Sequence, residues 1–80
     1  MTVRLREDGV IELAGVCPIE DAEILLGHLT GKLGARVDWR GCDEAHTAVV
    51  QVLRVAGAAL EGPPRGAFLS HVVEPALKRV

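Results

Sequence analysis

The chain has 80 residues, 49% of them hydrophobic, 25% charged and 2% aromatic, which is enough for one domain and too little for two. Nine basic residues against eleven acidic ones leave a formal net charge of -2, and this argues against a nucleic-acid-binding protein. Two cysteines are too few for a disulfide scaffold, and neither a signal sequence nor a membrane-spanning run is visible. We therefore expect a soluble, cytoplasmic protein that inserts into no membrane and folds without disulfides.

A β-hairpin is expected at the amino-terminal end of the sequence. Residues 2–6 alternate between apolar and charged side chains, and residues 10–14 form a second β-rich run. Asp8 and Gly9 lie between the two runs and are typical of a tight turn. The hairpin would thus join two neighbouring antiparallel strands.

The next segment, residues 18–33, has the features of an amphipathic helix. Pro18 suits the first helical position, and Gly34 suits a left-handed cap after the last one. Acidic side chains complement the helix dipole in the first turns, which favours dipole stabilisation over acid–base catalysis: Glu20, Asp21 and Glu23. The inward stripe is predicted to contain Ile19, Ala22, Leu26, Leu29 and Leu33, with Leu25 beside it.

A short strand over residues 35–39 is predicted to follow, and then a turn at Gly41 and Cys42. Asp43 is expected to cap a second helix over residues 44–60. After the breakers of residues 62–66, the segment 67–80 carries apolar side chains four residues apart, interrupted at Pro75. This predicts a kinked or broken terminal helix.

Taken together, these elements predict one α/β domain over residues 1–80. It has a small mixed sheet of three or four strands, an N-terminal hairpin and helices packed on one face. The second helix places Thr47, Gln51 and Arg54 opposite its apolar side, with Val50 on the flank. We predict a partner-binding surface there, apart from the terminal segment.

Chemistry other than binding finds weaker support in the sequence. Cys42 and His46 are four residues apart, a spacing that brings a thiol and an imidazole together on a helix, but no third group is evident to orient them. The remaining candidates for metal ligands are scattered over separate elements: Cys17, His28 and His71. We therefore expect no catalytic residue, no metal and no cofactor, and a buried structural Cys42.

Over roughly residues 1–60 the chain resembles the STAS domain, which occurs in sulfate-transporter tails and anti-sigma-factor antagonists. The resemblance lies in a strand ending in Val37-Asp38-Trp39 and a helix opening with His46-Thr47-Ala48. The family motif there is Asp, Ser or Thr, Ser or Ala, Gly, Leu, and Thr47 falls on the hydroxyl position. The sequence departs from it at His46, which replaces the Asp, and at Val49, which replaces the Gly.

The resemblance implies a shortened, non-enzymatic bacterial regulator of the STAS type, with Thr47 as the candidate for phosphorylation by a partner kinase. The partner would be an anti-sigma kinase-like protein or, alternatively, the ATPase of a membrane lipid or anion transporter. Association of the chain with itself stays open, and the competing class is a small thiol-dependent enzyme using Cys42. The residues predicted to bind the partner are His46, Thr47, Val50, Gln51 and Arg54.

Overall fold

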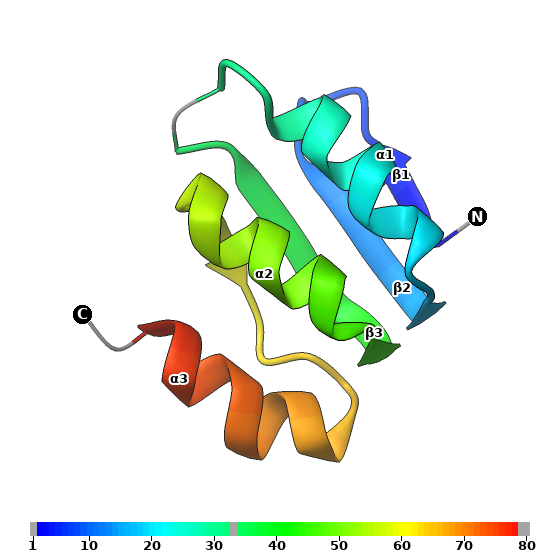
Figure 1. Cartoon of the computed structure of the whole chain (residues 1–80), viewed down its shortest axis with the longest axis vertical. Coiled ribbons are helices and arrows are strands. Elements are labelled where there is room, and N and C mark those ends of the chain that lie inside the picture. The colour runs from blue at the N-terminus through cyan, green and yellow to red at the C-terminus, as the bar shows by residue number, and fades with distance from the viewer. Residues whose placement is uncertain (1, 33, 79–80) are drawn as a thin grey trace.

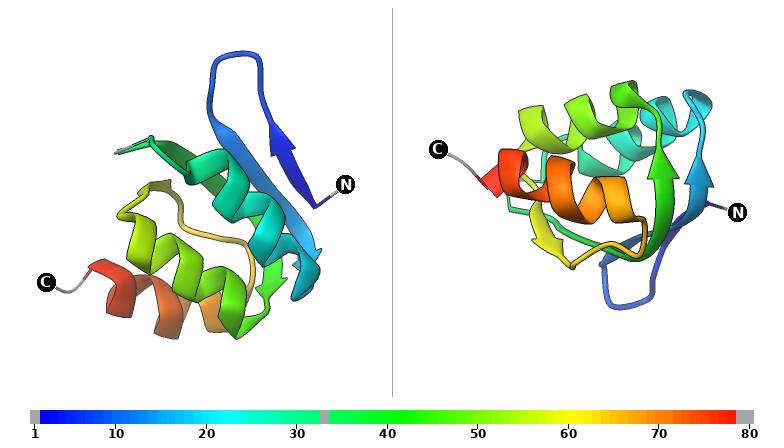
Figure 2. Two further views of the ribbon diagram at one scale, coloured as in Figure 1. Left: turned by 45° about the horizontal axis from the view of Figure 1, so that its top comes forward. Right: turned by 90° about the horizontal axis from the view of Figure 1, so that it is seen from below.

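The structure, a computed structural model that describes residues 2–32 and 34–78, is a small mixed α/β fold as predicted. Its four strands form one sheet in the order β1-β2-β3-β4, with bounds Val3–Leu5, Ile11–Cys17, Arg36–Ala45 and Ala59–Glu61. The first pair is antiparallel and the other two pairs are parallel. Helices α1 (Glu20–Leu29) and α2 (Thr47–Ala56) make the crossovers and cover one face of the sheet (Figures 1 and 2).

The predicted hairpin is confirmed. Val3 pairs with Leu13, and both side chains are buried in the core. Gly9 takes a left-handed φ of 86° in the turn and donates its backbone N–H to the carbonyl of Arg6 at 3.0 Å. The second strand runs three residues beyond the predicted end, to Cys17, because its last residues pair with β3.

The first helix is shorter than predicted. It begins at Glu20 and ends at Leu29, where the Thr30 hydroxyl donates to the Leu26 carbonyl at 2.6 Å and Gly31 takes a φ of 76°. Gly34, predicted as the cap, lies beyond this earlier end, and Leu33 lies outside the described residues.

The inward stripe of α1 also differs from the prediction. Leu25 is fully buried together with Ala22 and Leu29, whereas Leu26 is half exposed and Ile19 is exposed. The helix turns the side that carries Leu25 toward the core. Sequence periodicity alone cannot decide between this side and the neighbouring side that carries Leu26, because both have apolar residues at helical spacing.

The third strand is twice as long as expected because it stays paired with β2 as far as Ala45, and two irregularities shift the register of this pairing. Such bulges break the alternation of inward and outward side chains. Val37 and Trp39 point into the core, but the next core residue is Cys42, three positions after Trp39 instead of two. Gly41 and Cys42, predicted as a turn, are therefore strand residues.

The second helix begins at Thr47 instead of residue 44. Asp43 belongs to β3, where its carboxylate accepts hydrogen bonds from Arg65, and the cap is His46, whose Nδ1 accepts the N–H of Ala48 at 3.0 Å. The helix ends at Gly57, which takes a left-handed φ of 62°. Residues 59 and 60, predicted as its end, instead belong to β4, which pairs with β3.

The segment after β4 forms one helical run, residues 67–78, here called the terminal helix. After residues 67 and 68, which are α-helical, it continues as a π-helical stretch (η1, Leu69–Val73) and a final α-helical segment (α3, Glu74–Lys78). Pro75 has no N–H and its ring crowds the preceding turn, and the wider π turn ahead of it accommodates both effects. The terminal helix lies alongside α2 (Figures 1 and 2).

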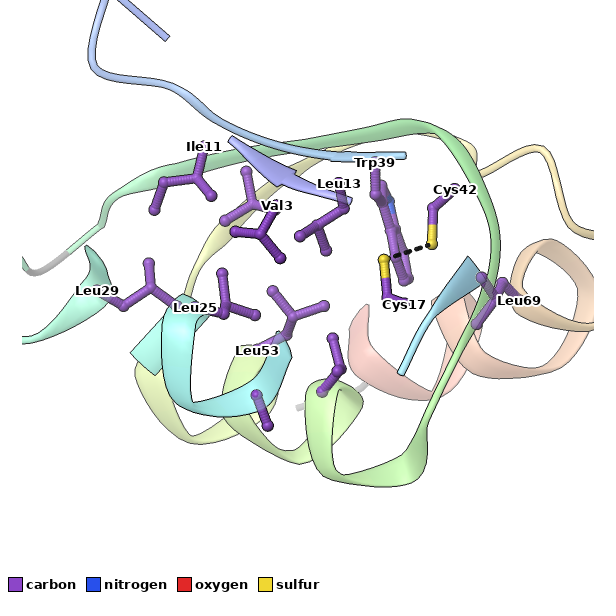
Figure 3. Close-up of a cluster of buried hydrophobic side chains, with 13 residues drawn as sticks. Val3, Ile11, Leu13, Cys17, Leu25, Leu29, Trp39, Cys42, Leu53 and Leu69 are labelled. Atoms are coloured by element: carbon purple, nitrogen blue, oxygen red, sulfur yellow. Dashed lines mark hydrogen bonds between the residues drawn. The ribbon is translucent and has the colours of Figure 1, made fainter. Parts of the chain in front are cut away.

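The core lies between the sheet and the helices (Figure 3). Its fully buried large side chains come from β1, β2, α1, β3 and α2: Trp39, Ile11, Leu13, Leu25, Val3, Val37 and Val49. The terminal helix contributes Leu69. The aliphatic composition thus supplies one continuous core around a single tryptophan.

The opposite face of the sheet carries charged residues that pair across strands. Asp38 on β3 is its most enclosed member, with 6% of its surface exposed. Its carboxylate accepts hydrogen bonds from the Arg40 backbone and guanidinium at 2.8 to 3.1 Å and from Arg6 Nη1 at 3.1 Å. The Arg40 side chain, assisted by Arg6, lowers the pKa of Asp38 to about 2.

This low pKa predicts how stability depends on pH. The ionised carboxylate stabilises the fold above the ordinary pKa of 3.8, and the contribution is lost as the pH falls toward 2. Because Arg40 is largely exposed, we expect Asp38→Asn to cost on the order of 1–2 kcal/mol at pH 7. Urea unfolding should show the cost vanishing between pH 4 and pH 2, and a cost independent of pH would contradict the assignment.

Candidate functional site

The outward side of α2 forms one wall of a groove. The terminal helix forms the opposite wall, and together they enclose a hollow of about 210 Å³. The lining side chains are Thr47, Val50, Gln51 and Arg54 from α2 and Val72, Val73, Ala76 and Leu77 from the terminal helix. An aliphatic centre beside polar side chains is the usual anatomy of a protein interface.

Local interactions hold the wall formed by α2 in place. Val49 and Leu53 are buried on its inner side, and they fix the rotation of the helix about its axis. The His46 cap and the left-handed Gly57 fix its two ends. The side chains of Thr47, Gln51 and Arg54 consequently point outward, as the helical pattern predicts.

Four of the five residues predicted to bind a partner line this groove, and His46 does not. His46 is exposed, with its ring turned to the backbone of α2 as the cap. Val50 is only partly exposed, on the side of α2 that faces the groove. We expected the partner-binding surface to lie apart from the terminal segment. The structure corrects this expectation, because the terminal helix supplies the second wall of the groove.

Sequence reasoning missed the residues of that second wall. Val72 and Ala76 belong to the apolar set that predicts the terminal helix, so the signal for an apolar side was present in the sequence. The spacing does not tell which other element the apolar side of the terminal helix faces. The tertiary structure sets that direction and places Val73 and Leu77 in the lining of the hollow, opposite Val50.

Arg54 is the notable charge of the groove. Among residues 2–32 and 34–78, every lysine and arginine except Lys32 and Arg54 has a carboxylate oxygen within 4.0 Å. Lys32 lies outside this groove, in a separate hollow beside the end of α1. A guanidinium beside an aliphatic surface, without a carboxylate partner, suits an acidic group on an incoming molecule.

Cys42 and His46 are not brought together. Cys42 faces the core from β3, whereas His46 is exposed at the start of α2. The neighbour of Cys42 is instead Cys17, with the two Sγ atoms 3.9 Å apart beside Trp39 (Figure 3). Hydrogen bonding between the thiols, together with burial, raises the pKa of Cys42, while the same contact lowers the pKa of Cys17.

The carboxylates of the first turn of α1 do not form a common site. Glu20 and Glu23 are exposed, as expected for residues that complement the helix dipole. Asp21, expected on the surface, is buried and accepts a hydrogen bond from the hydroxyl of Thr2, so it ties α1 to the residue directly before β1. In the part of the chain that the structure describes, no three His, Cys, Asp or Glu side chains are close enough to hold a metal ion.

Comparison with protein-family models, with curated proteins and with solved structures finds no match for the chain. None of the helices in the described residues combines the length and the apolar character needed to cross a membrane.

Proposed function

We propose that the chain is a non-enzymatic interaction module of the STAS type, which regulates a partner protein by binding it in the groove between α2 and the terminal helix. One observation carries this proposal: Arg54, without a carboxylate partner among the described residues, lies beside an aliphatic hollow. A bound protein segment would shield the valines from water and supply the missing negative charge.

The order of elements supports the resemblance on which the class depends. A hairpin, a helix, a strand and a second helix follow one another as the resemblance implies, and Thr47 is the first residue of α2. After α2 the chain adds only the three-residue strand β4 and the terminal helix, a short end that suits the shortened member of the family that we propose. These features are consistent with a compact STAS-like regulator acting in the cytoplasm.

The groove also favours a kind of partner segment. Its centre is lined by Val50, Val72 and Val73, which suit aliphatic or aromatic side chains, and Arg54 suits an Asp or Glu beside them. An acidic amphipathic helix presents both groups on one side. An anti-sigma kinase-like protein and a transporter ATPase remain the two proposed sources of that helix.

A thiol-dependent enzyme has less support. A catalytic cysteine needs an accessible thiolate with a base in contact, but Cys42 is fully buried and its pKa is raised. The nearest titratable partner is a second thiol instead of His46.

Charge reversal in the groove is expected to weaken partner binding at least tenfold. Arg54→Glu replaces the unpaired cation by an anion that repels the partner's carboxylate. The partner is first identified by photocrosslinking from position 51, at the polar rim, and is then purified. Titration calorimetry with the purified partner gives the dissociation constants of the wild-type protein and the variant.

Lys32→Glu is the matched control, because Lys32 is the other described cation without a carboxylate in reach and lies outside the groove. It should bind like wild type, and both variants should keep the wild-type melting temperature, since both side chains are exposed. Equal losses in the two variants would indicate a general effect of net charge, and undiminished binding of Arg54→Glu would remove the groove from consideration.

Phosphorylation of Thr47 is expected to weaken binding. A phosphate there adds about -1.5 to -2 charges at the mouth of the groove, close to the acidic Glu44, while Arg54 lies two turns away. Thr47→Glu should reproduce the loss. Thr47→Ala should bind normally and cost less than about 1 kcal/mol, because the capping bond of α2 comes from His46. Thr47→Glu binding as tightly as wild type would leave a module without a switch at this position.

A further inference from the structure

The two cysteines meet at the point where β2 ends against β3. Cys17 is the last residue of β2, and Cys42 pairs in the sheet with Gly15, two residues earlier. Cys17 faces the core in the regular alternation that also buries Ile11 and Leu13, and the irregularity between Glu12 and Ala14, which adds a residue to β3, turns Cys42 to the same side. Each cysteine is at least 99% buried. Their Sγ atoms are 3.9 Å apart, so rotations about the side-chain bonds and a small strand movement bring them to the bonding distance of about 2.05 Å.

We propose that Cys17 and Cys42 are a modification site, at which a disulfide oxidant such as glutathione disulfide forms a reversible intramolecular disulfide. The thiolate of one cysteine attacks the oxidant, breaking its S–S bond and releasing one glutathione thiolate. The second cysteine, after losing its proton, attacks the mixed disulfide and releases the second glutathione. Two protein thiols are thus oxidised and one disulfide is reduced to two thiols, so electrons and protons balance.

The first attacker in this sequence is Cys17. It ends its strand and is followed by Pro18, so local opening of the end of β2 exposes it without disturbing the middle of the sheet. The thiol contact also lowers the pKa of Cys17 and raises that of Cys42. Cys42, held within β3, then serves as the resolving thiol.

The position of the pair connects the modification to both walls of the groove. The backbone carbonyl of Cys17 accepts the N–H of His46, the capping residue of α2, at 2.9 Å. The carbonyl of Cys42 accepts the N–H of Gly66, directly before the terminal helix, at 3.0 Å. The residue directly before each groove helix is therefore hydrogen-bonded to one of the two cysteines, and a disulfide between the thiols restrains the start of both helices.

The experiment uses the purified chain and glutathione disulfide, without any partner, so its outcome is independent of the proposed function. After incubation under native conditions, trypsin is expected to yield peptides 7–32 and 41–54 joined by a disulfide and separable by reductant. The closed loop between the cysteines should raise the melting temperature by roughly 10 °C or more. Hydrogen exchange at the amides of His46 and Gly66 should slow, while that of Gly9 in the hairpin turn stays unchanged.

Cys17→Ala and Cys42→Ala are the matched controls, and neither should gain stability from the oxidant. A wild-type protein that carries glutathione on single cysteines, or that keeps two free thiols after the incubation, would overturn the modification site. A joined peptide pair with unchanged exchange at His46 and Gly66 would overturn its connection to the groove.

Discussion

Gly66→Ala is expected to destabilise the fold by roughly 3 kcal/mol or more, a large part of the total stability of a domain of this size. The added Cβ overlaps the backbone carbonyl oxygen of Asp43 and lies 2.7 Å from the carbonyl carbon. Backbone atoms of β3 cannot rotate away as the end of a flexible side chain does. The loop before the terminal helix must therefore separate from β3, which breaks the hydrogen bond from Gly66 to Cys42.

Gly27→Ala is the control for this substitution. Gly27 lies within α1 and has nothing within 4 Å of the added Cβ, so alanine should stabilise the protein by about 0.5–1 kcal/mol through helix propensity. Thermal unfolding followed by circular dichroism measures both variants. Equal melting temperatures of Gly66→Ala and wild type would show that the loop does not cross β3 at this distance.

Trp39→Ala is expected to cost about 3–5 kcal/mol and to leave the chain largely unfolded at room temperature. Trp39 is the largest fully buried side chain, and it points from the middle of β3 into the core, beside the two cysteines (Figure 3). Its removal leaves a cavity that the short strands around it cannot close. Circular dichroism in urea measures the loss, since the variant no longer contains the only tryptophan of the chain.

Trp39→Phe distinguishes the packing of the indole from its polar N–H. Within the described residues Nε1 is buried and has no hydrogen-bond partner, so a phenyl ring removes an unpaired donor along with some contacts. We expect this variant to lose less than half of what Trp39→Ala loses. A loss as large as that of Trp39→Ala would mean that the indole N–H forms a stabilising hydrogen bond, for which the buried carboxylate of Glu74 is the available acceptor.

The sequence by itself determined the elements whose signals are local. Asp8 and Gly9 give the hairpin its turn, and the run of apolar and polar residues after His46 gives α2 both its buried and its exposed sides. Such patterns reflect the backbone period of one element and need no information from elsewhere in the chain. For this reason the helical spacing alone places Thr47, Gln51 and Arg54 correctly on the exposed side of α2.

The tertiary structure alone decided what depends on contacts between distant segments. The irregular pairing of β3 displaces Cys42 from the regular alternation of inward and outward side chains. For this reason the sequence pattern predicted that the strand ends at Trp39. Residues 59–61 became a strand only because the edge of β3 was free to pair with them, although their composition suits a helix. The tie between Gly66 and β3 placed the terminal helix where it forms the second wall of the groove. The parallel pairing of β2 with β3 brought together two cysteines that are 25 residues apart. Each of these outcomes follows from interactions whose partners lie far apart in the chain, and no local pattern records them.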